Sequence, residues 1–186
     1  MDNQNKLIKP PDSNHKRYSS KPFPPYRFVP GINPHPTIDP EGHSYGRTDE
    51  IETFDPAKWQ ENETYLFGVD LYNFAYWWES HEAFEGLWGA LPKGDPLSHF
   101  LQGLIQISAA FLKWHMHEKK GVISLYKSAM DYLGKAYQDS PTHMGVDLQV
   151  HMDKLLRHFK KVTSEPSAWP SPIENYPFII LDRNLR

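Results

Sequence analysis

The sequence at residues 76–88 reads YWWESHEAFEGLW and mixes aromatic side chains with carboxylates and a histidine. At about 100° per residue on a helix, His81, Glu82 and Glu85 fall within an arc of about 100° beside an aromatic stripe. Carboxylates removed from water are costly unless they are paired, hydrogen-bonded or metal-bound. This segment is therefore the first candidate for a functional site.

Helical patterns continue on both sides of this segment and predict an all-α fold. We expect five helices, at about residues 55–73, 76–88, 97–117, 121–136 and 147–163. The first begins at Asp55-Pro56, an N-cap acceptor followed by proline at N1. Short links between consecutive helices favour antiparallel neighbours, so residues 55–163 are predicted to form one bundle of antiparallel helices.

The two ends of the chain are predicted to be extended. Residues 1–21 are polar and are expected to be a disordered tail. Nine of the 17 prolines lie in the first 40 residues, so residues 22–54 are expected to form a Pro/aromatic arm. Residues 164–186 contain an apolar run that should dock on the bundle or on a second copy. Either extended segment could therefore support a homo-oligomer.

Composition excludes several classes of function. The chain has no cysteine, so disulfides, thiol catalysis and thiolate metal sites are ruled out. Its net charge of −3 gives no basic footprint, so neither nucleic acid nor a membrane surface is an expected partner. We find no signal peptide and no apolar run long enough to span a bilayer, which predicts a cytoplasmic protein.

Residues 81–85 read HEAFE, the spacing of the metal motif HExxH with glutamate in the last place. His81 and Glu85, one turn apart, could share a divalent ion such as Zn, Mn or Fe. Glu82, rotated off that axis, could act as the catalytic general base for water. The pattern still requires a third ligand.

A second group of histidines lies at residues 34–46, which read PHPTIDPEGHSYG. His35, Asp39 and His43 recur every fourth residue, but the prolines forbid a helix, so any shared site would come from turns. His35 or His43 could supply the missing ligand. The alternative is a docked arm whose imidazoles are hydrogen-bonded to the backbone.

A structural interpretation of the carboxylates is also open. Glu79, Glu82 and Glu85 could accept hydrogen bonds from indole N–H groups or from the next helix. Gln102 and Gln106, one turn apart on that helix, are natural partners. A Gln–Glu lock of this kind would suit a non-enzymatic interaction module.

The remaining histidines look structural. His115 and His117 are expected to be exposed at a helix end, and His143, His151 and His158 to lie on the surface. We find no phosphate-binding loop, nucleophile elbow or dinucleotide fingerprint, so kinase, α/β-hydrolase and Rossmann folds are not expected.

Three stretches resemble the signature of the family called domain of unknown function 309: LFGVDLYN at 66–73, WESHEAFEGLW at 78–88 and FLQGLIQISAA at 100–110. The resemblance covers about residues 60–137. Residues 25–46 also resemble an N-terminal arm found on some members.

The resemblance implies a compact all-helical fold, a bacterial or archaeal intracellular origin, and the family's generic label of predicted metal-dependent hydrolase. It also implies a set of motif residues: Glu79, His81, Glu82, Glu85, Trp88, Gln102 and Gln106. We expect the face with Glu79, His81, Glu82 and Glu85 to form one wall of a polar pocket that the third helix closes, with the His35/His43 arm as a second element that could close it. Glu79, Trp88, Gln102 and Gln106 are the expected binding residues. One departure is Ala75, where similar chains often have glycine, so the turn there is expected to be less sharp.

Overall fold

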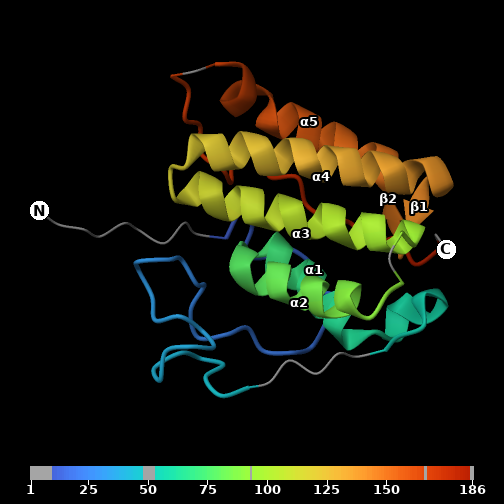
Figure 1. The fold of residues 1–186 in the computed structure, drawn as a ribbon, viewed down its shortest axis with the longest axis horizontal. Helices are drawn as coiled ribbons and strands as arrows, with labels where there is room; N and C mark the ends of the chain where they lie inside the picture. The colour runs from blue at the N-terminus through green and yellow to red at the C-terminus, as the bar shows by residue number, and fades with distance from the viewer. Residues whose placement is uncertain (1–9, 48–52, 93, 166, 185–186) are drawn as a thin grey trace, which may run out of the picture.

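The computed structural model describes residues 10–47, 53–92, 94–165 and 167–184. These residues are mostly helical, which confirms the predicted all-α bundle. The elements, labelled in Figure 1, are a 3-10 helix η1 (Pro56–Glu61), α1 (Glu63–Asn73), α2 (Trp77–Gly89), α3 (Pro96–His115), α4 (Lys119–Asp139), β1 (Thr142–His143), β2 (Val146–Asp147) and α5 (Leu148–Ser164).

The central helix is α3, as its apolar sequence indicates. It packs against α2 on one side and α4 on the other, while α1 packs on α2 and α5 on α4. Figure 1 shows α3 and α4 side by side along most of their lengths. Phe100, Ile107 and Phe111 of α3 have no exposed surface, so the main apolar core surrounds this helix.

The first predicted helix is divided in two. Asp55 caps η1 by accepting a hydrogen bond from the amide of Ala57, as expected, but Asn62 has a non-helical backbone. The Asn62 side chain accepts a hydrogen bond of 2.7 Å from the amide of Tyr65 and so starts α1. Asparagine competes for backbone donors in this way, which makes it a better N-cap than helix interior.

The turn between α1 and α2 is sharp, contrary to the expectation for Ala75. Ala75 has φ of 64°, the left-handed conformation that glycine adopts readily. The amides of Ala75 and Tyr76 donate to the carbonyls of Tyr72 and Leu71, at 3.1 and 2.8 Å. This is a Schellman motif, so alanine adopts the conformation that the motif requires.

A short β-hairpin links α4 to α5 and was not expected from the sequence. Thr142 pairs with Asp147 and His143 with Val146. The two-residue turn is Met-Gly rather than the Asn-Gly that signals such hairpins. The hydroxyl of Tyr65 donates to the carbonyl of Met144 at 2.9 Å, so the hairpin is fixed to α1.

The N-terminal segment makes specific contacts with α1. Within residues 1–21, expected to be a disordered tail, the backbone amides of Tyr18 and Ser19 donate to Asp70 at 2.8 and 2.9 Å. Arg17 Nε donates to the same carboxylate at 3.2 Å. Residues 1–9 of that predicted tail, and residues 48–52 of the predicted arm, lie outside the described residues.

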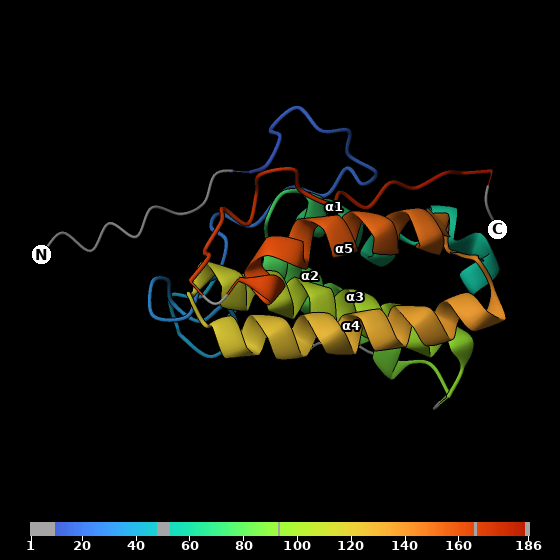
Figure 2. The ribbon, with the colours of Figure 1, turned by 90° about the horizontal axis from the view of Figure 1, so that it is seen from above.

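The C-terminal segment docks on the bundle of its own chain. The Asn73 side chain donates to the carbonyl of Ile179 and accepts from its amide, both at 2.9 Å. Figure 2 shows this segment, in red, returning beside α5 and α1. The ring of Phe178 stacks on that of His15 at 4.2 Å, so the N-terminal and C-terminal segments contact each other on one side of the bundle.

None of the helices in the described segments has both the length and the hydropathy that crossing a membrane requires.

Candidate functional site

The polar side chains in the middle of α2 lie in two different environments, one buried and one partly exposed. The Glu79 side chain is 5% exposed, whereas those of His81, Glu82 and Glu85 are 28%, 34% and 52% exposed. Only Glu79 therefore carries the desolvation cost that the sequence pattern indicated.

Glu79 is hydrogen-bonded by the arm, not by a neighbouring helix. Its Oε1 accepts from the backbone amide of Phe28 at 2.8 Å and lies 3.3 Å from His43 Nε2. Its Oε2 is buried and has no hydrogen-bond partner. Glu79 thus fixes two points of the arm on α2 and retains one free acceptor.

His81, Glu82 and Glu85 converge at the surface of α2. His81 Nδ1 lies 3.2 Å from a Glu82 oxygen and 3.6 Å from a Glu85 oxygen. One ligand atom from each residue lies within 4.8 Å of the others, and no other such group of three is found among the residues described. Two ligands of one tetrahedral ion with bonds of about 2.0–2.1 Å lie roughly 3.3 Å apart, so the spacing fits a divalent cation.

His35 lies away from this cluster. Its ring contacts those of Phe28 and Trp78 at 4.9 and 5.4 Å. Its Nδ1 lies 3.4 Å from both the amide and the hydroxyl of Thr37. His35 therefore packs within the arm and against α2, as in the alternative of a docked arm.

His43 is the arm histidine that meets α2, but at Glu79. Its Nδ1 lies 2.9 Å from Ser44 Oγ. Its backbone amide donates to Tyr26 Oη at 3.2 Å, and the Tyr26 hydroxyl donates to the carbonyl of Pro34 at 2.9 Å. These bonds fix the ring, which is 6% exposed, between the arm and the helix.

A pocket of about 410 Å³ lies between the arm and helices α1 and α2. We call it the arm pocket. Its lining consists of Pro22, Phe23, Pro24, Pro25, Thr37, His43, Ser44, Arg47, Phe67, Leu71, Trp78, Glu79, Glu82 and Ala83. Glu79 and Glu82 thus form part of a pocket wall, as expected. Of the two elements expected to close the pocket, the arm lines it and α3 does not, and His81 and Glu85 are outside its lining.

The predicted Gln–Glu lock is not formed. In the described parts of the chain, Gln102 and Gln106 are partly exposed and make no side-chain hydrogen bond. The buried polar contact between α2 and α3 is Ser80 with Ser108, whose hydroxyl oxygens lie 3.4 Å apart. Trp88 is 37% exposed at the end of α2 and does not line the arm pocket.

Ser44 is the pocket residue that the sequence interpretation missed. The signal was present, because residues 42–46 read GHSYG and have the spacing G-x-S-x-G. In α/β-hydrolases this motif joins a strand to a helix, whereas here it lies in consecutive turns of the arm. The match to the motif therefore carries no argument for that fold, and any role of Ser44 rests on its contacts.

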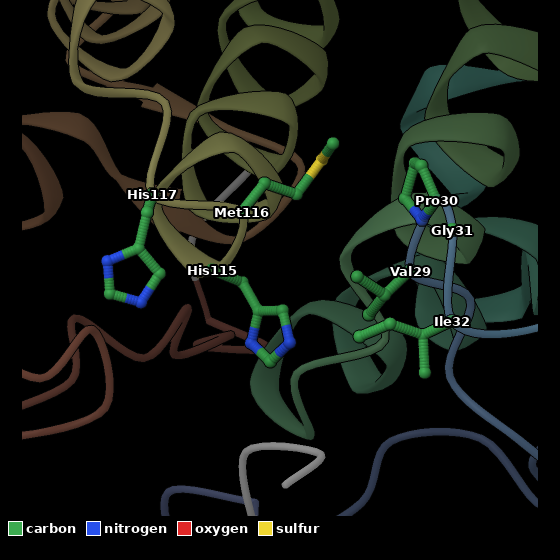
Figure 3. Close-up of a pocket in the computed structure, with 7 residues that line it drawn as sticks. All are labelled: Val29, Pro30, Gly31, Ile32, His115, Met116 and His117. Atoms are coloured by element: carbon green, nitrogen blue, oxygen red, sulfur yellow. The ribbon is translucent and has the colours of Figure 1, made fainter. Parts of the chain in front are cut away.

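A second pocket, of about 320 Å³, lies where the arm passes the end of α3 (Figure 3). His115 lies between that helix end and the arm residues Val29 and Ile32, whereas His117 is turned away from them. The His117 ring stacks on Trp169 at 5.1 Å. Burial lowers the pKa of His115, whose Nδ1 has no partner. The two histidines do not converge on one ligand position.

The prediction that the α5 histidines lie on the surface is wrong for His151. This residue is 3% exposed, and neither ring nitrogen has a partner. Burial lowers its pKa to about 3. His158 is partly buried, its Nδ1 lies 3.2 Å from the carbonyl oxygen of Asn175, and burial lowers its pKa to about 4.

Comparison with known families identifies one part of the chain. The family described as "Domain of unknown function (DUF309)" matches residues 65–125, which confirms the resemblance noted in the sequence. The matched range contains α1 from Tyr65 onward, all of α2 and α3, and the start of α4. Comparisons with curated proteins and with solved structures give no match.

Proposed function

We propose that this chain, whose residues 65–125 carry the DUF309 domain, is a metal-dependent hydrolase that acts at the arm pocket. The observation that carries the proposal is the convergence of His81, Glu82 and Glu85 beside a pocket that Glu82 also lines. A bound divalent cation would polarise a carbonyl or phosphoryl oxygen and activate water.

Each residue of the cluster has a distinct role. His81 and Glu85, one turn apart, would hold the ion. The arm histidines were expected to supply a third ligand, but His43 faces Glu79 and His35 packs against Trp78. Glu82 would supply the third ligand with one oxygen, and its other oxygen would serve as the general base for water. One imidazole and two carboxylates suit Zn, Mn or Fe.

The experiment is a calorimetric titration of Zn²⁺, Mn²⁺ or Fe²⁺ into tag-free protein that has been stripped with a chelator. We expect one ion per chain, and at least tenfold weaker binding for His81→Ala and for Glu85→Gln. His99→Ala, which changes a partly exposed histidine of α3 outside the cluster, is the matched control. Substoichiometric binding, or equal affinity in His81→Ala and His99→Ala, would contradict the metal assignment.

We propose a second candidate function, a non-enzymatic interaction module, because buried carboxylates hold both the N-terminal segment and the arm. Asp70 is fully buried and accepts three hydrogen bonds from Arg17, Tyr18 and Ser19. In this interpretation the polar lock joins the arm to the helices and presents the Pro/aromatic surface to a partner.

A double-mutant cycle in metal-free unfolding tests this second function. It combines Glu79→Gln with His43→Gln. A coupling free energy above about 1 kcal/mol supports the lock, and additive effects of the two substitutions contradict it.

A further inference from the structure

We infer that Ser44, His43 and Glu79 form a hydrogen-bonded relay in which Ser44 is a nucleophile for acyl transfer from an ester. This relay goes beyond the proposed metal site because it uses different residues and needs no cation. It occupies the arm pocket, which all three residues line.

The distances match the requirements for an activated nucleophile. Ser44 Oγ lies 2.9 Å from His43 Nδ1, and His43 Nε2 lies 3.3 Å from Glu79 Oε1. With the imidazole proton on Nε2, the serine hydroxyl donates to Nδ1 and the ring donates to the carboxylate. A nucleophile, a base and a group that orients the base are the parts of a catalytic triad. In the common triad Nε2 of the histidine faces the serine and Nδ1 faces the carboxylate, whereas here Nδ1 faces Ser44 and Nε2 faces Glu79. A triad is recognised by the geometry and roles of its residues, so this exchange is compatible with one.

The base and its carboxylate are more buried than the serine, which is the arrangement that a catalytic nucleophile requires. The side chains of His43 and Glu79 are 6% and 5% exposed, whereas Ser44 is only partly buried. The base and its carboxylate are therefore shielded from water while the hydroxyl remains accessible. A hydrogen bond from the amide of Phe28 fixes Glu79 Oε1.

The other carboxylate oxygen of Glu79 provides an independent indication of a ligand. Its Oε2 is buried and has no partner, although Glu79 lines the pocket. Buried acceptors are almost always satisfied in native structures, so an exception needs an explanation. A donor group on a bound ligand would satisfy this oxygen.

Both glycines of the G-x-S-x-G segment are required by the shape of the loop. A Cβ on Gly42 would lie 2.2 Å from the carbonyl oxygen of His35 and 2.4 Å from that of Pro36. Gly46 has φ of 71°, which favours glycine. The amide of Ser44 donates to the carbonyl of Pro36 at 2.9 Å. The close contact at Gly42 and the hydrogen bond from the amide of Ser44 therefore hold this loop against residues 35–36.

The pocket wall indicates the substrate class. The lining also contains four large apolar side chains, Phe23, Phe67, Leu71 and Trp78, and one cation, Arg47. A volume of about 410 Å³ lies at the small end of the range for ligand pockets. We therefore assign an ester with a short apolar acyl group, whose carbonyl oxygen becomes negatively charged during attack and is attracted by Arg47.

The reaction balances with water as the only co-reactant. Ser44 Oγ forms a bond to the carbonyl carbon, and its proton moves to His43 Nδ1. The ester C–O bond then breaks, and the leaving alcohol takes that proton from His43. Water, losing a proton to His43, attacks the acyl group on Ser44 and releases the carboxylic acid, and the proton returns to Ser44.

Labelling of the full chain by a fluorophosphonate probe, with EDTA present throughout, tests the nucleophile. We expect one label per chain, mapped to Ser44 by mass spectrometry, and at least a 100-fold slower reaction for Ser44→Ala. Ser20→Ala, at an exposed serine of the N-terminal segment, should react as the wild type does. A label on another residue, or equal rates in wild type and Ser44→Ala, would overturn the proposal. Because EDTA removes any cation, failure of the metal site cannot produce either result.

Glu79 positions His43 and does not touch the substrate carbonyl, so its role is tested by the separate effects on kcat and KM. Glu79→Gln keeps an oxygen acceptor for the amide of Phe28 but removes the charge that orients His43. For p-nitrophenyl butyrate we expect at least a tenfold lower kcat with little change in KM, in a variant whose circular dichroism shows that it is folded. Wild-type kcat in a folded Glu79→Gln variant would remove Glu79 from the relay.

Discussion

Glu79 Oε1 lies 3.3 Å from His43 Nε2 and joins the middle of α2 to an arm residue 36 positions earlier in the chain. Both side chains are almost completely buried. The most buried carboxylate of α2 is therefore held by the Pro-rich arm through one of its oxygens, and both residues of this contact line the arm pocket. Glu79 therefore both holds the arm on α2 and forms part of the site.

Ala75→Gly should stabilise the protein by roughly 0.5–1 kcal/mol. Ala75 has φ of 64°, and a left-handed conformation costs a residue with a Cβ about 1–2 kcal/mol, part of which the backbone entropy of glycine offsets. Urea unfolding measures the change. Ala90→Gly, at a right-handed C-cap with φ of −83°, is the control and should destabilise the protein. Equal effects of the two substitutions would contradict this explanation.

Asp70→Ala should release the N-terminal segment from α1. The substitution leaves the amides of Tyr18 and Ser19 without their acceptor and removes the partner of Arg17. Losing the acceptor of a buried donor costs about 1–3 kcal/mol, so we expect cleavage by trypsin after Arg17 to become at least tenfold faster. Asp12→Ala, at an exposed position of the same segment, should leave the cleavage rate unchanged.

Asn73→Ala should loosen the C-terminal segment. The Asn73 amide makes both a donor and an acceptor bond with the backbone of Ile179, which is fully buried. We expect a loss of about 2–3 kcal/mol in unfolding free energy, and faster hydrogen exchange at the amide of Ile179. Asn184→Ala, exposed in the same segment, is the control. Unchanged protection of Ile179 would show that other contacts hold the segment.

His151→Leu should reduce the loss of stability in acid. Burial lowers the pKa of His151 from 6.5 to about 3, so this residue favours the folded state above pH 6.5. That contribution is lost as the pH falls toward 3, because the unfolded chain binds the proton first. Below about pH 6 the slope of unfolding free energy against pH should fall by roughly 1.4 kcal/mol per unit in the variant. Met152→Leu, which removes no titrating group, should keep the wild-type slope.

The helices were predictable because their signals are local. Apolar periodicity together with Asp55, Asp95 and Asp147, whose side chains cap the following helices, gives the helical elements without knowledge of their neighbours. The break at Asn62 was missed because an asparagine inside a periodic pattern can either continue the helix or cap a new one. Packing decides between these two conformations.

The site was only partly predictable because its partners are distant in sequence. The proximity of His81, Glu82 and Glu85 follows from helix geometry alone. The contacts of Glu79 with the arm depend on how a segment without periodic structure folds back on α1 and α2. The predicted hydrogen bonds of Gln102 and Gln106 with the α2 carboxylates are not formed. Both glutamines are partly exposed, so water can satisfy their amides.

The sequence by itself determined an all-α domain, its helix boundaries to within a few residues, and the polar arc on α2, because periodicity and capping act over one or two turns. Only the tertiary structure decided which carboxylate is buried, that His43 and Ser44 meet Glu79, and that His151 lies in the core. The physical reason is that burial depends on what covers a helix face. Here the covering segments are the two extended ends of the chain, whose paths are fixed by hydrogen bonds to Asp70, Asn73 and Glu79.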